Sequence, residues 1–318
     1  MSSTPASTSS DPGTVDDGLA WPSDFAARSA DGLDLAVVLG GGGLFLLAWY
    51  VAYLQELKVH GVDLRKNDRI VGTSAGSVMA AGLTGGKLGR MHRLIDTLEK
   101  QPGIIARLAP AGDPTPAQSR ARDLFWYMPD AKIETIRAVG HAALAAQTQG
   151  ADTTARTMTL VLGMRKWPGA NLHTTCMDTY TGERVVVTAD AGVSPGRAAA
   201  ASSAVPGIFS PQPIGDRKCM DGGVSNSGTH SDLAAGARRV VLLSLPPLDL
   251  GLPEGADRPT DPDAELAALE ASGSEVFHRT PEDVDAEKLM DPASVPLAFA
   301  MGKRQATADA DALRTFLT

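Results

Sequence analysis

A chain of 318 residues, with 43% hydrophobic and 21% charged residues, has the composition of a globular protein rather than a disordered one. Its net charge of −8 excludes the broad basic surface of a nucleic-acid-binding protein and gives no overall attraction to anionic lipid. Cys176 and Cys219 lie far apart without a partner pattern, so the sequence predicts two buried thiols rather than a disulfide framework or a zinc site.

The N-terminal segment 1–32 has the composition of a polar tail. It is poor in apolar residues and rich in Ser, Thr, Pro and Asp, and it has neither the basic start nor the apolar run of a secretory signal. We expect a disordered tail over residues 1–32 and one folded domain over residues 33–318, since no repeat or linker divides the remainder. The expected location is the cytoplasm.

Residues 33–54 form an apolar stretch whose length would suit a membrane span. Glycines 40–43 stand at its centre, however, and each glycine inside a helix costs about 1 kcal/mol relative to alanine. A buried strand at Leu35–Leu39, a glycine turn and a buried helix at Leu44–Leu57 explain the stretch better. A second strand is predicted at Arg69–Gly72. This strand–helix–strand order implies neighbouring parallel strands in an α/β sheet with helices on its faces.

The rest of the chain alternates helix and strand signals. The aromatic residues of 124–128 are expected to pack in the core, with a lid or pocket wall as the alternative. Residues 101–120 are rich in Pro, Gly and Ala without a clear period, which predicts a loop. The acidic segment over about 246–290, interrupted by prolines, is expected to be a surface excursion. The other predicted elements are helices at 77–100, 131–149 and 293–317, two strands flanking the turn at Thr181–Gly182, and a buried strand at Arg239–Leu245.

Residues 72–76, with the sequence GTSAG, match the Gly-x-Ser-x-Gly pattern of a nucleophile elbow. In such an elbow, a sharp turn between a strand and a helix exposes the serine at the carboxyl edge of the sheet. Gly72 and Gly76 must then be small, because neighbouring chain passes close to them. The N-terminus of the following helix favours developing negative charge. Ser74 is therefore a candidate nucleophile.

The glycine run 40–43 supplies candidate hydrogen-bond donors for an oxyanion. It ends the first predicted strand one crossover before the elbow, so parallel pairing brings both turns to the same edge of the sheet. Glycines let successive N–H groups converge, because no Cβ obstructs them. The alternative is a dinucleotide-binding loop, but Phe45 occupies the position of the third glycine in G-x-G-x-x-G, which disfavours it.

Asp221 is the leading candidate for a general base. It follows a short apolar run and precedes Gly222 and Gly223, a pattern that leaves a carboxylate at the end of a strand with open space beside it. An ordinary Asp-Gly turn is the alternative interpretation. Among the six histidines, His230 is a minor candidate for the base because it follows this turn. The other five lie beside no convincing motif: His60, His92, His141, His173 and His278.

Taken together, these motifs resemble the patatin-like phospholipase family over roughly residues 34–245. The resemblance rests on four motifs in order: the glycine run, the elbow, the segment 198–214 and the Asp-Gly-Gly turn. It implies a three-layer sandwich with a mostly parallel central sheet and helices on both faces. It also implies a lipid acyl hydrolase that acts on phospholipids, lysophospholipids or related acyl esters and contacts lipid surfaces transiently. No cofactor is expected, and no ligand spacing suggests a metal.

The resemblance also implies roles for single residues. Ser74 is the nucleophile and Asp221 its base, in a Ser–Asp dyad that needs no histidine, and Gly41, Gly42 and Gly43 form the oxyanion hole. The supporting glycines of the motifs are Gly40, Gly72, Gly76, Gly222 and Gly223.

One departure from the family pattern keeps alternatives open. Family members commonly carry Arg or Lys, then Gly, just after the glycine run, whereas this chain has Phe45 and Leu46. A catalytically quiet lipid-binding protein is therefore one alternative. The other is a generic esterase with a Ser–Asp–His triad, for which His230 and His278 are the candidate histidines.

Overall fold

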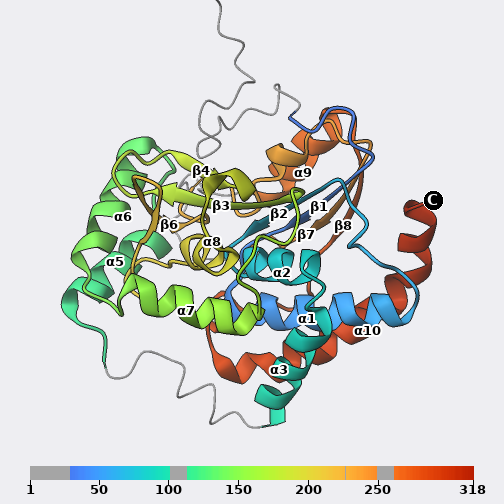
Figure 1. The fold of residues 1–318 in the computed structure, drawn as a ribbon, viewed down its shortest axis with the longest axis horizontal. Coiled ribbons are helices and arrows are strands. Elements are labelled where there is room, and N and C mark those ends of the chain that lie inside the picture. Colours follow the sequence, from blue (N-terminus) through green and yellow to red (C-terminus); the bar gives the residue numbers. More distant parts are fainter. Residues whose placement is uncertain (1–28, 101–112, 226, 249–260) are drawn as a thin grey trace, which may run out of the picture.

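The computed structural model describes residues 29–100, 113–225, 227–248 and 261–318, and within them it contains one sheet of eight strands (Figure 1). The strands are short. They are β1 (Leu35–Leu39), β2 (Arg69–Thr73), β3 (Leu172–Asp178), β4 (Arg184–Val187), β5 (Gln212–Ile214), β6 (Arg217–Asp221), β7 (Arg239–Leu243) and β8 (Glu275–Arg279). Strands β1, β2, β3, β4 and β7 are buried along almost their whole length, whereas the edge strand β8 is partly exposed.

The strand order is β5-β6-β3-β2-β1-β7-β8, with β4 paired to β3 outside this path. The strands β3, β2, β1, β7 and β8 are mutually parallel. Strands β4 and β6 run antiparallel to β3, and β5 runs antiparallel to β6. The predicted mostly parallel sheet is therefore confirmed. Leu39 of β1 pairs with Gly72 of β2, so the glycine run and the elbow leave the sheet side by side at its carboxyl edge.

Helices cover both faces of the sheet, as Figure 1 shows, with α1, α2 and α10 on one side and α9 on the other. Side chains of β1 alternate accordingly: Leu35, Val37 and Leu39 pack with α1 and α10, and Ala36 and Val38 pack with Leu269 of α9. The helices are α1 (Gly43–Val59), α2 (Ala75–Thr84), α3 (Leu88–Lys100), α5 (Pro116–Trp126), α6 (Ile133–Ala145), α7 (Ala151–Leu162), α8 (Pro195–Ser202), α9 (Pro262–Ala271) and α10 (Val295–Phe316).

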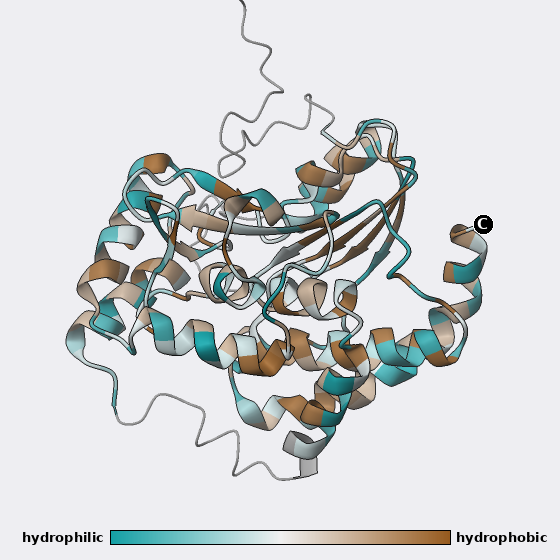
Figure 2. Ribbon diagram, in the orientation of Figure 1, coloured by the Kyte–Doolittle hydropathy of each residue, from teal (hydrophilic) through white to brown (hydrophobic). Residues whose placement is uncertain are grey.

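From Gly43 to Leu54, helix α1 carries no charged side chain on any side, and this part packs between the sheet and α10. The central strands are coloured as hydrophobic in Figure 2. The aromatic polar groups of α1 find partners on α10: Trp49 Nε1 donates to Gln305 Oε1 at 2.6 Å, and the Tyr53 hydroxyl donates to Asp309 Oδ2 at 2.8 Å. The apolar stretch 33–54 is thus a strand, a turn and a core helix, as predicted. None of the described helices is long and apolar enough to cross a bilayer.

Three sequence predictions need correction. The helix expected over 77–100 is two helices, α2 and α3, because Gly85 and Gly86 interrupt it and Gly86 has a φ of 66°. The loop expected over 101–120 contains the start of α5, and the remainder of it at 101–112 lies outside the described residues. The start is set by a capping box in which Thr115 accepts the Gln118 N–H and the Gln118 side chain accepts the Thr115 N–H.

The third correction concerns the segment 246–290, expected to be a surface excursion. Residues 249–260 lie outside the described residues, but the remainder contains α9 and the strand β8, which pairs in parallel with β7 and extends the sheet. The final helix, α10, agrees with the prediction. Most of the expected N-terminal tail, residues 1–28, lies outside the described residues, while Ala30 is buried and donates its N–H to Ala235 O at 2.9 Å.

Candidate active site

Ser74 lies in a strained turn between β2 and α2. Its φ of 50° and ψ of −119° fall in backbone space that costs a non-glycine residue about 1–3 kcal/mol. The glycines on either side are sterically required. A Cβ on Gly72 would lie 2.6 Å from Gly76 O, and a Cβ on Gly76 would overlap Leu39 O. The predicted elbow geometry is therefore present, and it leaves Ser74 8% exposed at the edge of the sheet.

A serine on α8 holds the elbow from outside its own motif. The Ser74 N–H donates to Ser202 Oγ at 2.8 Å, and the Ser77 hydroxyl donates to Ser74 O at 2.7 Å. Ser202 is fully buried. Sequence reasoning included Ser202 within the segment 198–214 but gave it no role. Its contact with the elbow depends on α8 packing beside α2.

The glycine run passes directly beside the nucleophile. A Cβ on Gly41 would lie 3.3 Å from Ser74 Cβ, so a side chain there would crowd the serine. The Gly40 N–H donates to Leu243 O and the Gly41 N–H donates to Gly228 O, each at 2.9 Å. The N–H of Gly41, expected to serve the oxyanion, is thus already engaged. The N–H groups of Gly42 and Gly43 have no acceptor among the described residues.

Two helix N-termini meet at this edge of the sheet. Helix α1 begins at Gly43 and α2 begins at Ala75, and neither has an acidic residue in its first turn. Their dipoles therefore both favour a negative charge next to Ser74. Phe45, which stands where the family commonly has a basic residue, is buried in the core and adds no charge of its own.

Asp221 ends β6, on the other side of β3 from the elbow. Cys176 of β3 pairs with Asp221, and the chain then crosses over β3 toward the elbow. A Cβ on Gly222 would lie 2.6 Å from Thr175 O and 2.9 Å from Thr73 Cγ2, so only glycine fits this crossing. Asp221 is 2% exposed. Its Oδ1 accepts the Gly223 N–H at 2.8 Å, while its buried Oδ2 accepts no hydrogen bond from the described residues.

Burial raises the pKa of Asp221 to about 6, and the Gly223 N–H and the Ser74 side chain partly oppose this rise. The Ser74 hydroxyl is thus near enough to act on the carboxyl, although the pair does not form a hydrogen bond of ordinary geometry. Such contacts commonly shorten only when substrate binds. A carboxylate with a pKa near 6 is ionised at neutral pH, and it is a stronger base than a solvated aspartate.

His230 supports the turn that carries Asp221. Its Nδ1 lies 3.4 Å from Arg184 Nη1, a permanent donor, so Nε2 carries the ring proton and donates to Gly222 O at 2.9 Å. Burial, and then the Arg184 charge, lower the pKa of His230 to about 4, so the ring is neutral at neutral pH. Arg184 also pairs with Asp232 at 2.6 Å. Both ring nitrogens are therefore occupied away from Ser74.

The second candidate histidine, His278, lies on β8, where its Nε2 is 2.9 Å from Ser244 Oγ. This contact places it at the end of β7 rather than at the elbow. Among the described residues, no three His, Cys, Asp or Glu side chains gather in a way that could hold a metal ion.

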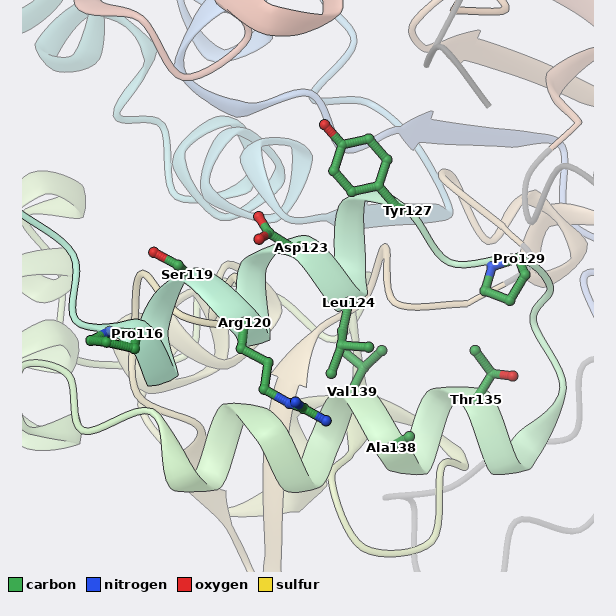
Figure 3. A pocket seen from close by; sticks show the side chains of 10 residues that line it. All are labelled: Pro116, Ser119, Arg120, Asp123, Leu124, Tyr127, Pro129, Thr135, Ala138 and Val139. Atoms are coloured by element: carbon green, nitrogen blue, oxygen red, sulfur yellow. The ribbon is translucent and has the colours of Figure 1, made fainter. Parts of the chain in front are cut away.

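Helix α5 contacts the site on one side and lines a groove on the other. Phe125 lies 3.9 Å from the position that a Cβ on Gly223 would take. Between α5 and α6 there is a groove of about 850 Å³, in which Leu124 and Val139 point toward one another (Figure 3). None of the candidate catalytic residues lines it. Of the three aromatic residues, Phe125 and Trp126 are partly buried against the core, whereas Tyr127 is exposed and lines the groove.

Comparison with known proteins identifies the family. Residues 37–233 match the patatin-like phospholipase family, and this match covers more than half of the chain. The chain therefore belongs to the patatin-like phospholipase family. No curated protein matches it.

Two solved structures are similar to the chain. One is the type III effector protein ExoU, with 16% sequence identity and a TM-score of 0.34, covering 87% of this chain and 53% of that one. The other is VipD from Legionella pneumophila, with 14% identity and a TM-score of 0.41, covering 93% of this chain and 70% of that one. The chain thus spans about half the length of the first.

Proposed function

We propose that this protein is a serine hydrolase that cleaves carboxylic ester bonds of phospholipids, lysophospholipids or related acyl esters through a dyad of Ser74 and Asp221. The observation that carries the proposal is that Oδ2 of Asp221, although buried, accepts no hydrogen bond from the described residues. Leaving a buried acceptor without a hydrogen bond costs about 1–3 kcal/mol or more. A group held at this cost beside a strained serine is typical of a catalytic site.

In the proposed reaction, Asp221 accepts the proton of the Ser74 hydroxyl as Oγ attacks the ester carbonyl. Asp221 then gives this proton to the oxygen of the departing alcohol, and the acyl group stays bonded to Ser74 Oγ. A water molecule next gives a proton to the same carboxylate as it attacks the acyl-enzyme, and Asp221 returns that proton to Ser74 Oγ as the fatty acid leaves. A Cβ on Gly41 would lie 3.3 Å from Ser74 Cβ, so the glycine run passes beside the serine, which supports a position for the ester carbonyl over this run.

Gly42 and Gly43 are the proposed oxyanion donors. Their N–H groups stand at the N-terminus of α1 without an acceptor among the described residues, whereas the Gly41 N–H is bonded to Gly228 O. Gly41 is therefore not a proposed donor, and its role is to leave space beside Ser74 because it has no side chain. Loss of one such donor typically costs about 3–4 kcal/mol of transition-state stabilisation. Helix dipoles supply positive potential without the basic residue that Phe45 replaces.

The alternatives have less support. A Ser–Asp–His triad would need a histidine free to accept the serine proton, but His230 is committed to Gly222 O and Arg184, and His278 contacts Ser244. A lipid-binding protein without catalytic activity would not require the strained backbone of Ser74 or the buried carboxyl group of Asp221.

A fluorophosphonate probe tests the proposal. Wild-type protein should be labelled at Ser74 and should hydrolyse p-nitrophenyl esters and phospholipid in vesicles. Ser74→Ala should abolish both labelling and turnover, and Asp221→Asn should leave a labelled but very slow enzyme. Absence of labelling in folded wild-type protein, together with no turnover on any ester of the panel, would contradict the proposal.

A further inference from the structure

A short loop behind the site contacts both the glycine run and the elbow. This support loop comprises residues 227–230. Gly228 O accepts the Gly41 N–H at 2.9 Å, and the Thr229 Cγ2 lies 3.1 Å from the position that a Cβ on Gly40 would take. Thr229 O also accepts a hydrogen bond from Thr73 Oγ1, one residue before the nucleophile, at 3.4 Å. A shift of this loop would therefore displace the glycine run.

One carboxylate fixes the support loop. Glu265 Oε1 accepts the Gly228 N–H at 3.1 Å, and Oε2 accepts the Ser227 hydroxyl at 3.0 Å and also the Thr229 hydroxyl. Three successive residues thus donate to a single side chain. The same peptide segment that binds Glu265 through the Gly228 N–H holds Gly41 through the Gly228 carbonyl.

The support loop also reaches the turn that carries Asp221. Ser227 Oγ accepts the His230 N–H at 2.6 Å while its hydroxyl donates to Glu265. His230 in turn donates to Gly222 O. Glu265 is therefore linked by two short chains of hydrogen bonds to the glycine run on one side and to the Asp-Gly-Gly turn on the other.

Glu265 lies on the face of its helix that packs against the sheet, not on the solvent face. It lies on α9, is buried at 9% exposure, and its neighbour Leu269 packs in the core on this face of the sheet. Burial raises the pKa of Glu265 and nearby Asp232 adds to this rise, whereas the hydrogen bonds from Thr229, Ser227 and Gly228 oppose it. The ionised carboxylate is therefore stabilised by its three donors. Helix α9 lies beyond the residues 37–233 that match the family.

We propose that Glu265 is a positioning residue for the hydrolase: by clamping residues 227–229 it holds the glycine run and the Asp-Gly-Gly turn in register with Ser74. This inference rests on the proposed function. Glu265 itself does not touch the reacting atoms. Its loss should therefore slow the chemical step more than it weakens substrate binding, because a misplacement of about 1 Å in a catalytic group can cost about a hundredfold in rate.

The test compares Glu265→Ala, Glu265→Gln and the matched control Glu270→Gln, which changes an exposed glutamate on the same helix. We expect kcat for p-nitrophenyl ester hydrolysis to fall about tenfold to a hundredfold in Glu265→Ala, with KM within about threefold of wild type. Glu265→Gln should be intermediate, because its amide oxygen can still accept the Gly228 N–H but its NH2 group meets a Ser227 oxygen that already accepts other bonds. Glu270→Gln should match wild type.

Hydrogen exchange gives a readout that does not depend on turnover. Measured by mass spectrometry on peptides covering residues 40–43, exchange in Glu265→Ala should be at least about tenfold faster than in wild type, since the Gly41 N–H loses its fixed acceptor. Active-site titration with the fluorophosphonate probe counts the folded sites, so that kcat is expressed per competent enzyme.

The two proposals fail in different ways. Wild-type protein without labelling or turnover, but with faster exchange in Glu265→Ala, would contradict the hydrolase while keeping the clamp. An active wild type whose Glu265→Ala variant keeps kcat within about threefold, or exchanges residues 40–43 at the wild-type rate, would overturn the positioning role. If Glu265→Ala does not fold, Glu265→Gln decides the matter: wild-type kcat in that variant contradicts the proposal.

Discussion

Replacing Asp221 by Asn should make the protein more stable at neutral pH while removing its activity. The side chain is buried, and burial raises its pKa from 3.8 to about 6. Between these two values the folded state holds a proton that the unfolded state has released. The folded state is therefore destabilised as the pH rises through this window, and the destabilisation is complete above the folded pKa.

The size of the effect follows from the shift. A difference of about 2 pKa units corresponds to about 3 kcal/mol, because each unit is worth about 1.4 kcal/mol. Roughly half of this develops between pH 5 and pH 8. Asn at position 221 keeps an oxygen for the Gly223 N–H but carries no charge, so its free energy of unfolding lacks this dependence on pH.

The assay is urea unfolding of wild type and Asp221→Asn at pH 5, 6, 7 and 8, alongside p-nitrophenyl ester turnover. The stability difference should move in favour of the variant by about 1.4 kcal/mol across this range, and kcat/KM of wild type should rise through a pKa near 6. Asp216→Asn, an exposed change in the same β-hairpin, is the control. A stability difference that does not vary with pH, or a variant with wild-type turnover, would refute the reasoning.

Three further changes test the site. Gly76→Ala should lower the free energy of unfolding by at least about 3 kcal/mol, measured in urea, because the new Cβ would overlap Leu39 O. The control is Gly89→Ala, where only the end of the Arg93 side chain lies within 4 Å, and it should be neutral or stabilising by up to about 1 kcal/mol. Ser202→Ala removes the acceptor of the Ser74 N–H, so we expect a loss of about 1–2 kcal/mol in urea unfolding and slower fluorophosphonate labelling; unchanged labelling would contradict a role in shaping the elbow. His230→Ala should lower stability by about 1–3 kcal/mol, yet its folded fraction should keep kcat within about tenfold of wild type, since a loss of a hundredfold or more would favour a catalytic histidine.

The sequence predicted the parts of the fold that depend on local pattern. Apolar runs at 35–39 and 69–72 predicted the central parallel strands, and four glycines between apolar residues predicted a turn rather than a membrane span. The start of α5 lies within the segment that was predicted to be a loop, although Thr115, Pro116 and Gln118 carry a local signal for it: a capping box with proline at the first helical position. The strand β8 was not predicted, since a five-residue edge strand in an acidic segment has no strong periodicity.

The candidate dyad was visible in the sequence for a steric reason. A strained serine turn needs glycine at positions 72 and 76, and the crossing after Asp221 needs glycine at 222, so each demand of the backbone leaves a recognisable residue. These requirements are met within a few residues of the side chain that they serve. The sequence therefore determined Ser74, Asp221 and the glycine run as candidates.

Only the tertiary structure decided what surrounds them. The Ser74 N–H is bonded to Ser202, 128 positions away, and Glu265 accepts hydrogen bonds from a loop 36–38 positions before it. The engagement of the Gly41 N–H and the commitment of His230 to Gly222 likewise appear only when separate strands are placed in order. A hydrogen bond between distant segments requires no particular neighbouring residues, so it leaves no local pattern, and the sheet order alone brings its two ends together.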